Sequence, residues 1–110
     1  ARLGLGDRDV FLNVVGGLAL KEPASDLAVA AALISAYKGV ALPADAVYFG
    51  EVGLLGEVRP VGGTEARLRE ASGHGFRKAY LPRTDGLPKR TGLELVEIAT
   101  VEELAERVGD

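Results

Sequence analysis

The stretch PASDLAVAAALISAYKG, residues 23–39, decides how the fold of this chain is interpreted. Between Pro23 and Gly39 it is rich in alanine and leucine and contains neither glycine nor proline, so it predicts a helix over residues 24–38. Proline suits the first turn of a helix, where its missing N–H is not needed, and glycine suits the position just after the last turn. Because small apolar residues lie on nearly every face, we expect backbone from other elements to approach this helix from more than one side.

Pairs of strands are predicted on both sides of this helix in the sequence. Before it, residues 9–15 are mostly β-branched or apolar and end at Gly16-Gly17, which predicts a strand, a tight turn and a return strand over residues 18–20. After it, residues 46–51 and 57–61 are separated by a short connection that is rich in glycine. This spacing predicts a second hairpin.

The rest of the chain completes a layered domain. Residues 64–72 predict a second, amphipathic helix, and residues 78–82 and 93–98 predict two further strands. Thr100 and Glu103 have the spacing of a capping box, which predicts that a final helix begins here. The resulting order β-β-α-β-β-α-β-β-α indicates a layered α/β or α+β domain and not a repeat array.

The composition indicates a single soluble domain. A length of 110 residues suits one domain over residues 1–110, and 47% hydrophobic residues are too many for a disordered chain. No uncharged apolar run is long enough for a membrane span, and no secretory signal pattern occurs, so we expect a cytoplasmic protein with no membrane partner. Because the chain contains no methionine, we expect it to be excised from a longer multidomain protein.

Few residues in this chain can carry metal or thiol chemistry. With no cysteine and one histidine it cannot form a zinc ribbon or a thiol nucleophile, so we expect no metal site and no cofactor in this domain. The one histidine, His74, lies between two glycines at a predicted helix end, where it is interpreted as a cap or a solvated side chain. The pairs Gly16-Gly17 and Gly62-Gly63 match no phosphate-binding motif and are interpreted as turn residues.

The charges are distributed unevenly along the chain. A net charge of -3 argues against a domain that binds nucleic acid by bulk electrostatics. Residues 77–90 nevertheless carry five basic side chains and one acidic side chain, whereas residues 94–110 carry six acidic side chains and one basic side chain. A local basic patch can therefore exist on an acidic domain.

Several of these stretches together resemble a known family. They are FLNVVGG at residues 11–17, KEPASDLAV at 21–29, FGEVGL at 49–54 and GEVRPV at 56–61, followed by Glu65, Arg67-Leu68, Glu70-Ala71 and Gly75-Phe76. In this order they resemble the C-terminal, Lon-protease-like domain of the RadA (Sms) family of bacterial DNA repair proteins. The pair Gly62-Gly63 departs from the usual RadA pattern and is more similar to Lon protease.

The resemblance implies the Lon-protease-like fold, which is related to the second domain of ribosomal protein S5. Comparison with Lon protease places Ala24 at the position of the serine nucleophile and Glu65 at the position of the lysine base. The resemblance therefore implies a protease scaffold with no catalytic residue. Ser25 lies one residue away, which rotates its hydroxyl by about 100° on a helix, and it is interpreted as a capping residue.

The resemblance also implies a place in a longer protein. In the family this domain follows a zinc-binding module and a RecA-like ATPase, which would hold the zinc, magnesium and ATP. The domain itself helps to form a hexameric ring and contacts single-stranded or branched DNA during recombination, with a recombinase as a candidate partner. Two alternatives stay open: an oligomerisation scaffold that never contacts DNA, and a residual hydrolase that uses Ser25 with Lys21.

Five basic residues are predicted to contact DNA. They are Arg67, Arg69, Arg77 and Lys78, with Lys38 as a further candidate. Taken singly each is more often a solvated surface charge, but together they form the densest positive stretch of an acidic domain. For the ring we expect head-to-tail contact between the basic residues 77–90 of one copy and the acidic C-terminal segment of the next.

Overall fold

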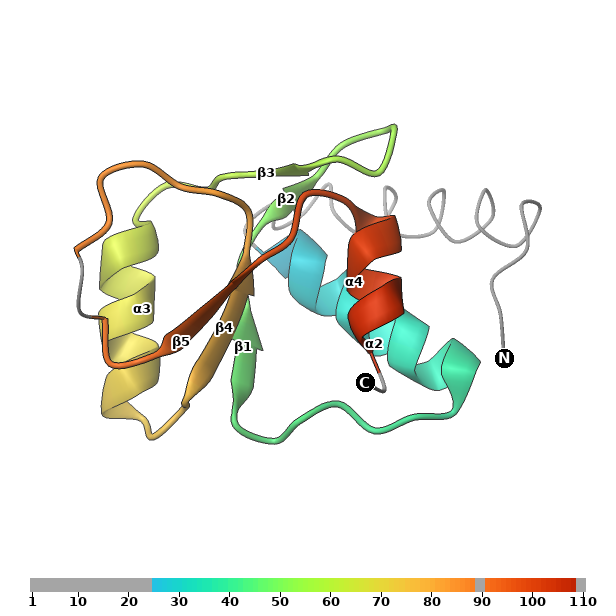
Figure 1. Ribbon diagram of the computed structural model, residues 1–110, viewed down its shortest axis with the longest axis horizontal. Coiled ribbons are helices and arrows are strands. Elements are labelled where there is room, and N and C mark those ends of the chain that lie inside the picture. The colour runs from blue at the N-terminus through green and yellow to red at the C-terminus, as the bar shows by residue number, and fades with distance from the viewer. Residues whose placement is uncertain (1–24, 89–90, 109–110) are drawn as a thin grey trace.

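In the computed structural model, which describes residues 25–88 and 91–108, helices cover both faces of a small parallel sheet (Figure 1). In chain order the elements are α2 (Asp26–Lys38), β1 (Ala46–Tyr48), β2 (Glu51–Val52), β3 (Val58–Arg59), α3 (Thr64–Gly73), β4 (Lys78–Leu81), β5 (Glu94–Glu97) and α4 (Val101–Arg107). The predicted α+β class is confirmed, because parallel and antiparallel pairings occur together with helices. The strands expected within residues 9–20 lie outside the described residues.

The sheet has the strand order β1-β4-β5, and both of its pairings are parallel. The strands β2 and β3 form a separate antiparallel pair, which confirms the second hairpin. The prediction of one strand over residues 46–51 is wrong, because β1 ends at Tyr48, residues 49–50 belong to no strand, and β2 begins at Glu51. A Cβ atom on Gly50 would lie 2.7 Å from Cγ1 of Val58, so the hairpin packs directly on this glycine.

The apolar side chains gather in two clusters, one on each face of the sheet. Tyr80 of β4 belongs to the cluster with α2 and α4, whereas its neighbours Ala79 and Leu81 pack with Leu68 of α3. This alternation is expected for a strand that is buried on both faces. The helices α2 and α4 therefore lie against one face and α3 against the other, as Figure 1 shows.

The helix α2 is the centre of the larger cluster. Four of its residues are fully buried and form one stripe along the helix: Leu27, Ala30, Ala31 and Ile34. The helix contacts β1, β2 and α4, but Ala32 and Ala36 are exposed, so the described elements cover one face of the helix and not several as expected. It ends at Gly39 with φ +67°, the left-handed conformation that favours glycine after a helix.

The last helix begins at the predicted capping box. The N–H of Glu103 donates a hydrogen bond to Oγ1 of Thr100 at 3.1 Å, and the Glu103 carboxylate accepts one from the N–H of Ala99 at 2.7 Å. Two free donors at the start of α4 are thereby satisfied. In the part of the chain that the structure describes, no helix is long and apolar enough to cross a membrane.

Candidate nucleic-acid interface

The position predicted for a degenerate nucleophile lies at the start of α2. Ala24 and Lys21 fall outside the described residues. Ser25 precedes the helix, but its side chain makes no capping hydrogen bond, so the capping role expected for it is wrong. Its backbone is near-helical, with φ −94° and ψ 0°, whereas a capping hydroxyl is placed by an extended backbone.

Asp26 anchors this helix end instead. Its Oδ2 accepts a hydrogen bond from the N–H of Val52 at 2.9 Å, and the N–H of Leu27 donates to the carbonyl of Gly50 at 3.0 Å. The side chain is 1% exposed, and Oδ1 is buried without a hydrogen-bond partner among the residues that the structure describes. Burial raises the pKa of the Asp26 carboxyl, the Val52 hydrogen bond opposes this, and the nearby charge of Glu51 raises it further.

Glu65, the residue at the predicted base position, lies in the first turn of α3. Its carboxylate forms an ion pair with Arg69, one turn later, at 3.5 Å, and its side chain is 56% exposed. A carboxylate cannot replace the neutral amine that a Ser-Lys dyad needs. Near the start of a helix it has an ordinary role, because negative charge is favourable there.

The two arginines of α3 are exposed, and each has a partner close by in the chain. Arg69 pairs with Glu65, and Nε of Arg67 donates to the carbonyl of Gly62 at 3.1 Å. Gly63, the residue before the helix, has φ +70°, so this member of the glycine pair has the conformational role that the sequence indicated. Both guanidinium groups remain accessible to solvent.

Arg77 and Lys78 lie side by side where β4 begins, but they belong to different faces. Both N–H groups donate to the carbonyl of Asp45, at 2.8 and 3.2 Å. Nζ of Lys78 lies 5.9 Å from the ring centroid of Tyr80, on the face covered by α2 and α4. Because side chains alternate along an extended chain, Arg77 is directed toward the α3 face. From the sequence we expect these two residues to form one basic patch. In the structure they lie on different faces of the sheet.

Lys38 has contacts that the sequence did not indicate. Its Nζ donates hydrogen bonds to the carbonyls of Ala105 and Val108, at 2.8 and 2.9 Å. These carbonyls lie at the C-terminal end of α4, where a helix has free acceptors and favours positive charge. Lys38 therefore ties α4 to α2 and lies on the α4 side of the sheet, away from the arginines of α3.

A pocket beside Lys78, here called the tyrosine pocket, was not predicted. Tyr48 and Tyr80 lie opposite each other in β1 and β4, and their rings stack with centroids 4.9 Å apart. Burial, with a smaller effect of Tyr80, raises the pKa of Tyr48 to about 12. The pocket has a volume of about 260 Å³, and its lining residues include two cations and no carboxylate. They are Val40, Ala41, Leu42, Pro43, Tyr48, Lys78, Tyr80, Leu104, Arg107 and Val108.

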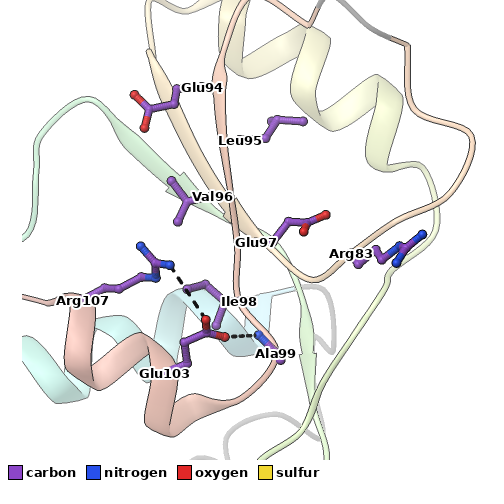
Figure 2. Close-up of a pocket in the computed structure, with 9 residues that line it drawn as sticks. All are labelled: Arg83, Glu94, Leu95, Val96, Glu97, Ile98, Ala99, Glu103 and Arg107. Carbon is purple, nitrogen blue, oxygen red and sulfur yellow. Dashed lines mark hydrogen bonds and ion pairs between the residues drawn. The ribbon is translucent and has the colours of Figure 1, made fainter.

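A larger groove, of about 740 Å³, follows β5 at the edge of the described sheet. Figure 2 shows its lining side chains on both sides of the strand, with Arg107 and Glu103 of α4 beside it. Glu103 lies 3.9 Å from Arg107, and Glu94 and Glu97 add two more carboxylates. With three carboxylates against the two arginines Arg83 and Arg107, the groove is a poor surface for a phosphate backbone.

The oppositely charged stretches of the sequence meet inside one molecule. Lys78 of β4 lies directly opposite Glu94 of β5 in the parallel pairing. Lys89, Arg90 and Asp110 lie outside the described residues. A contact between these stretches therefore exists without a second copy of the chain.

Comparison with known proteins gives one matching family and a set of close relatives. A family model described as "Subunit ChlI of Mg-chelatase" matches residues 5–85. DNA repair protein RadA of Brucella abortus (strain 2308) is 49% identical over 104 residues, which are 94% of this chain and 22% of that protein. The same-named protein of Pseudomonas aeruginosa is 48% identical over 99 residues, which are 88% of this chain and 22% of that protein. The RadA of Aquifex aeolicus (strain VF5) is 44% identical over 106 residues, 96% of this chain and 24% of its own length.

These matches cover the chain and the relatives unequally. Nearly all of this chain is aligned, but it spans only about a fifth of the length of the first curated relatives it matches. The similarity therefore concerns one segment of those proteins.

Proposed function

Because the chain belongs to the family described as subunit ChlI of Mg-chelatase and is similar to DNA repair protein RadA over nearly its whole length, we propose that it acts in DNA repair as a DNA-binding and assembly domain. In this proposal it is the Lon-protease-like part of a longer cytoplasmic repair protein that processes branched recombination intermediates. It has no protease activity of its own. Copies of the domain assemble into a ring, hexameric in the full protein.

The proposed DNA contact rests on two basic residues at the start of β4. Arg77 is exposed, and no carboxylate within residues 25–88 and 91–108 forms an ion pair with it. Lys78 lies one residue away and lines a pocket without carboxylates. Cations that are not already neutralised gain most from a phosphate. We therefore place the DNA contact at the end of the sheet where β4 begins, with Arg77, Arg67 and Arg69 on its α3 side and Lys78 on its α4 side. Lys38, whose Nζ already binds two carbonyls of α4, lies at the margin.

The loss of protease activity is supported by charge. The exposed anion Glu65 lies at the position where a Ser-Lys hydrolase needs a neutral amine, and it pairs with Arg69. The alternative hydrolase, which would use Ser25, predicts covalent labelling by a phosphonate-type serine probe. We expect no labelling of Ser25, and labelling would contradict the proposal.

The DNA contact is tested by fluorescence anisotropy with labelled single-stranded and branched DNA over a series of salt concentrations. Phosphate contacts make the affinity fall with salt, by about 0.7–0.9 in the log-log slope for each contact. The double variant Arg77→Ala/Lys78→Ala should bind more weakly, with a slope flatter by about one to two. Its circular dichroism and thermal unfolding should match the unmodified chain, because both side chains are solvent-accessible.

Arg59→Ala is the matched control. It also removes a positive charge, but from a guanidinium that Glu57 already neutralises at 2.6 Å. It should leave both the affinity and the salt slope close to their original values. If the folded double variant keeps its affinity and slope, the alternative scaffold without DNA contact is favoured.

A further inference from the structure

The tip of the β2–β3 hairpin carries two leucine side chains that are exposed to solvent. Leu54 is 92% exposed and Leu55 is 87% exposed, whereas the other exposed large apolar side chains among the described residues, Tyr37 and Leu95, reach 43% and 36%. In Figure 1 the hairpin projects from the body of the molecule, away from the sheet. Single exposed apolar residues are ordinary, but two adjacent leucines on a projection are typical of an interaction site.

Hydrogen bonds within the tip hold its backbone in place in the single chain. The N–H of Gly56 donates to the carbonyl of Gly53 at 3.0 Å, and the N–H of Leu55 donates to the Glu57 carboxylate at 3.1 Å. Arg59 binds the same carboxylate at 2.6 Å and, as the largest cause, lowers the pKa of Glu57. A Cβ atom on Gly53 would collide with that carboxylate, so a larger residue there would displace the Glu57 side chain from the turn. A fixed turn loses little conformational freedom on binding.

A receptor of suitable chemistry lies at the other end of the same chain. The tyrosine pocket is apolar along the segment that follows α2 and along α4, where it is lined by Val40, Leu42, Pro43, Leu104 and Val108. Figure 1 shows the hairpin tip at the top of the view and the segment after α2 at the bottom. One chain therefore cannot fill its own pocket with its own tip, but a second copy can.

Size and charge also match. About 260 Å³ is room for roughly eight or nine groups the size of a water molecule, at about 30 Å³ each, and two leucine side chains bring eight carbon atoms. The tip is flanked by the carboxylates of Glu51 and Glu57, with Arg59 between them. The pocket presents Lys78 and Arg107. Arg59 offsets one of these two carboxylates, and the net negative charge that remains favours the pocket over a phosphate backbone.

We infer that Leu54 and Leu55 of one copy insert into the tyrosine pocket of a second copy, head to tail. This inference rests on the assembly role proposed above and names the contact that would carry it. Because the two surfaces differ, each bound copy still offers a free tip at one end and a free pocket at the other. Repeating this head-to-tail contact produces a closed ring of copies if the rotation from each copy to the next allows closure.

Disulfide trapping tests this contact, because the chain contains no cysteine of its own that could compete. Leu54→Cys is placed in one copy and Pro43→Cys, at an exposed pocket residue, in another. Mixing the two under mild oxidation should give a cross-linked dimer, and a copy carrying both changes should give a ladder of larger species. The control pairs Leu54→Cys with Ala66→Cys, an exposed position on α3, and should give at least tenfold less dimer. Equal yields for the two pairs would overturn the inference.

Sedimentation of folded variants measures self-association and distinguishes this specific contact from the general assembly role. Leu54→Ser/Leu55→Ser changes only exposed side chains, and Arg107→Glu reverses the charge at the pocket, so each should weaken self-association at least tenfold. A mixture of the two variants should recover dimers, because one retains its pocket and the other its tip. If the serine variant associates like the unmodified chain, the contact is wrong while the assembly role stands. If the unmodified chain neither associates nor cross-links, both fail; if the serine variant loses DNA affinity but associates normally, the tip binds DNA instead.

Discussion

Asp26 shows most directly what one residue contributes. The sequence drew attention to Ser25, but the carboxylate that anchors α2 belongs to the next residue and binds Val52, 26 residues away. A pattern of neighbouring residues cannot reveal such a contact, because only the tertiary fold brings Val52 to the start of α2. The anchor has a cost as well, since Oδ1 is buried without a hydrogen-bond partner in the described part of the chain.

Two substitutions separate the hydrogen bond of Asp26 from its charge. Asp26→Ala leaves the buried N–H of Val52 without an acceptor and should lower the free energy of unfolding by about 1–3 kcal/mol. Asp26→Asn keeps an acceptor and removes the charge, so it should be at least as stable as the unmodified chain at neutral pH. Urea denaturation of the three proteins measures both effects. Equal losses for the two variants would contradict this account.

The same residue gives a pH dependence whose sign is fixed. The pKa of Asp26 is raised in the folded state, so the folded chain binds the proton more tightly than the unfolded chain does. The stabilisation is complete below the unfolded pKa of about 3.9 and is lost as the pH rises through the folded pKa. Compared with the unmodified chain, Asp26→Asn should therefore gain relative stability between about pH 4 and pH 7. Denaturation at the two pH values checks this.

Among the elements, the hairpin after α2 was predicted from its glycines, but the break before it was not. Alternation and β-branching favour one continuous strand over residues 46–51. In the structure, β1 joins the sheet and β2 joins the hairpin, because Val58 packs against the space above Gly50. Propensity describes which residues suit a strand, whereas the partner strand decides where that strand ends.

Gly50→Ala should disturb this junction. The added Cβ would lie 2.7 Å from Cγ1 of Val58, which is too close for an ordinary contact. We expect thermal or urea unfolding to show a loss of about 1–3 kcal/mol, as for other overpacked sites. Gly62→Ala is the matched control, because nothing lies within 4 Å of a Cβ there, and it should change stability by less than about 0.5 kcal/mol. Similar losses for both would show that the close contact is not the cause.

At the scale of the whole molecule, the helices and the composition of the layers follow from the sequence, but the strand order does not. Lys78 is the clearest case. Its neighbours Tyr80 and Glu94 were each predicted to lie in strands, yet only the order β1-β4-β5 places Glu94 opposite Lys78 and the tyrosine stack beside it. Long-range pairing is chosen by the packing of both faces together, which no local window contains.

Lys38 tests whether its hydrogen bonds to α4 stabilise the layer that α2 and α4 form on one face of the sheet. Lys38→Met keeps the aliphatic stem and removes two charged hydrogen bonds to the end of α4, so it should cost roughly 1–3 kcal/mol of stability. Lys78→Met should instead lower DNA affinity with little change in stability. Comparing denaturation and anisotropy for the two variants distinguishes the roles. A fully stable Lys38→Met with DNA affinity as low as that of Lys78→Met would assign Lys38 to the interface.

The position of β4 between β1 and β5 has a consequence for how the chain is made. Both described pairings of the sheet include β4, and the first of them joins residue 46 to residue 78. During synthesis β1 leaves the ribosome long before its partner, and the hairpin and α3 must also emerge before any pairing of this sheet is possible. Contacts so distant in the chain form slowly, because the loop must close before they stabilise anything. A nascent chain stalled before residue 78 therefore exposes β1 without its sheet, and it is at this stage that we expect a chaperone to bind.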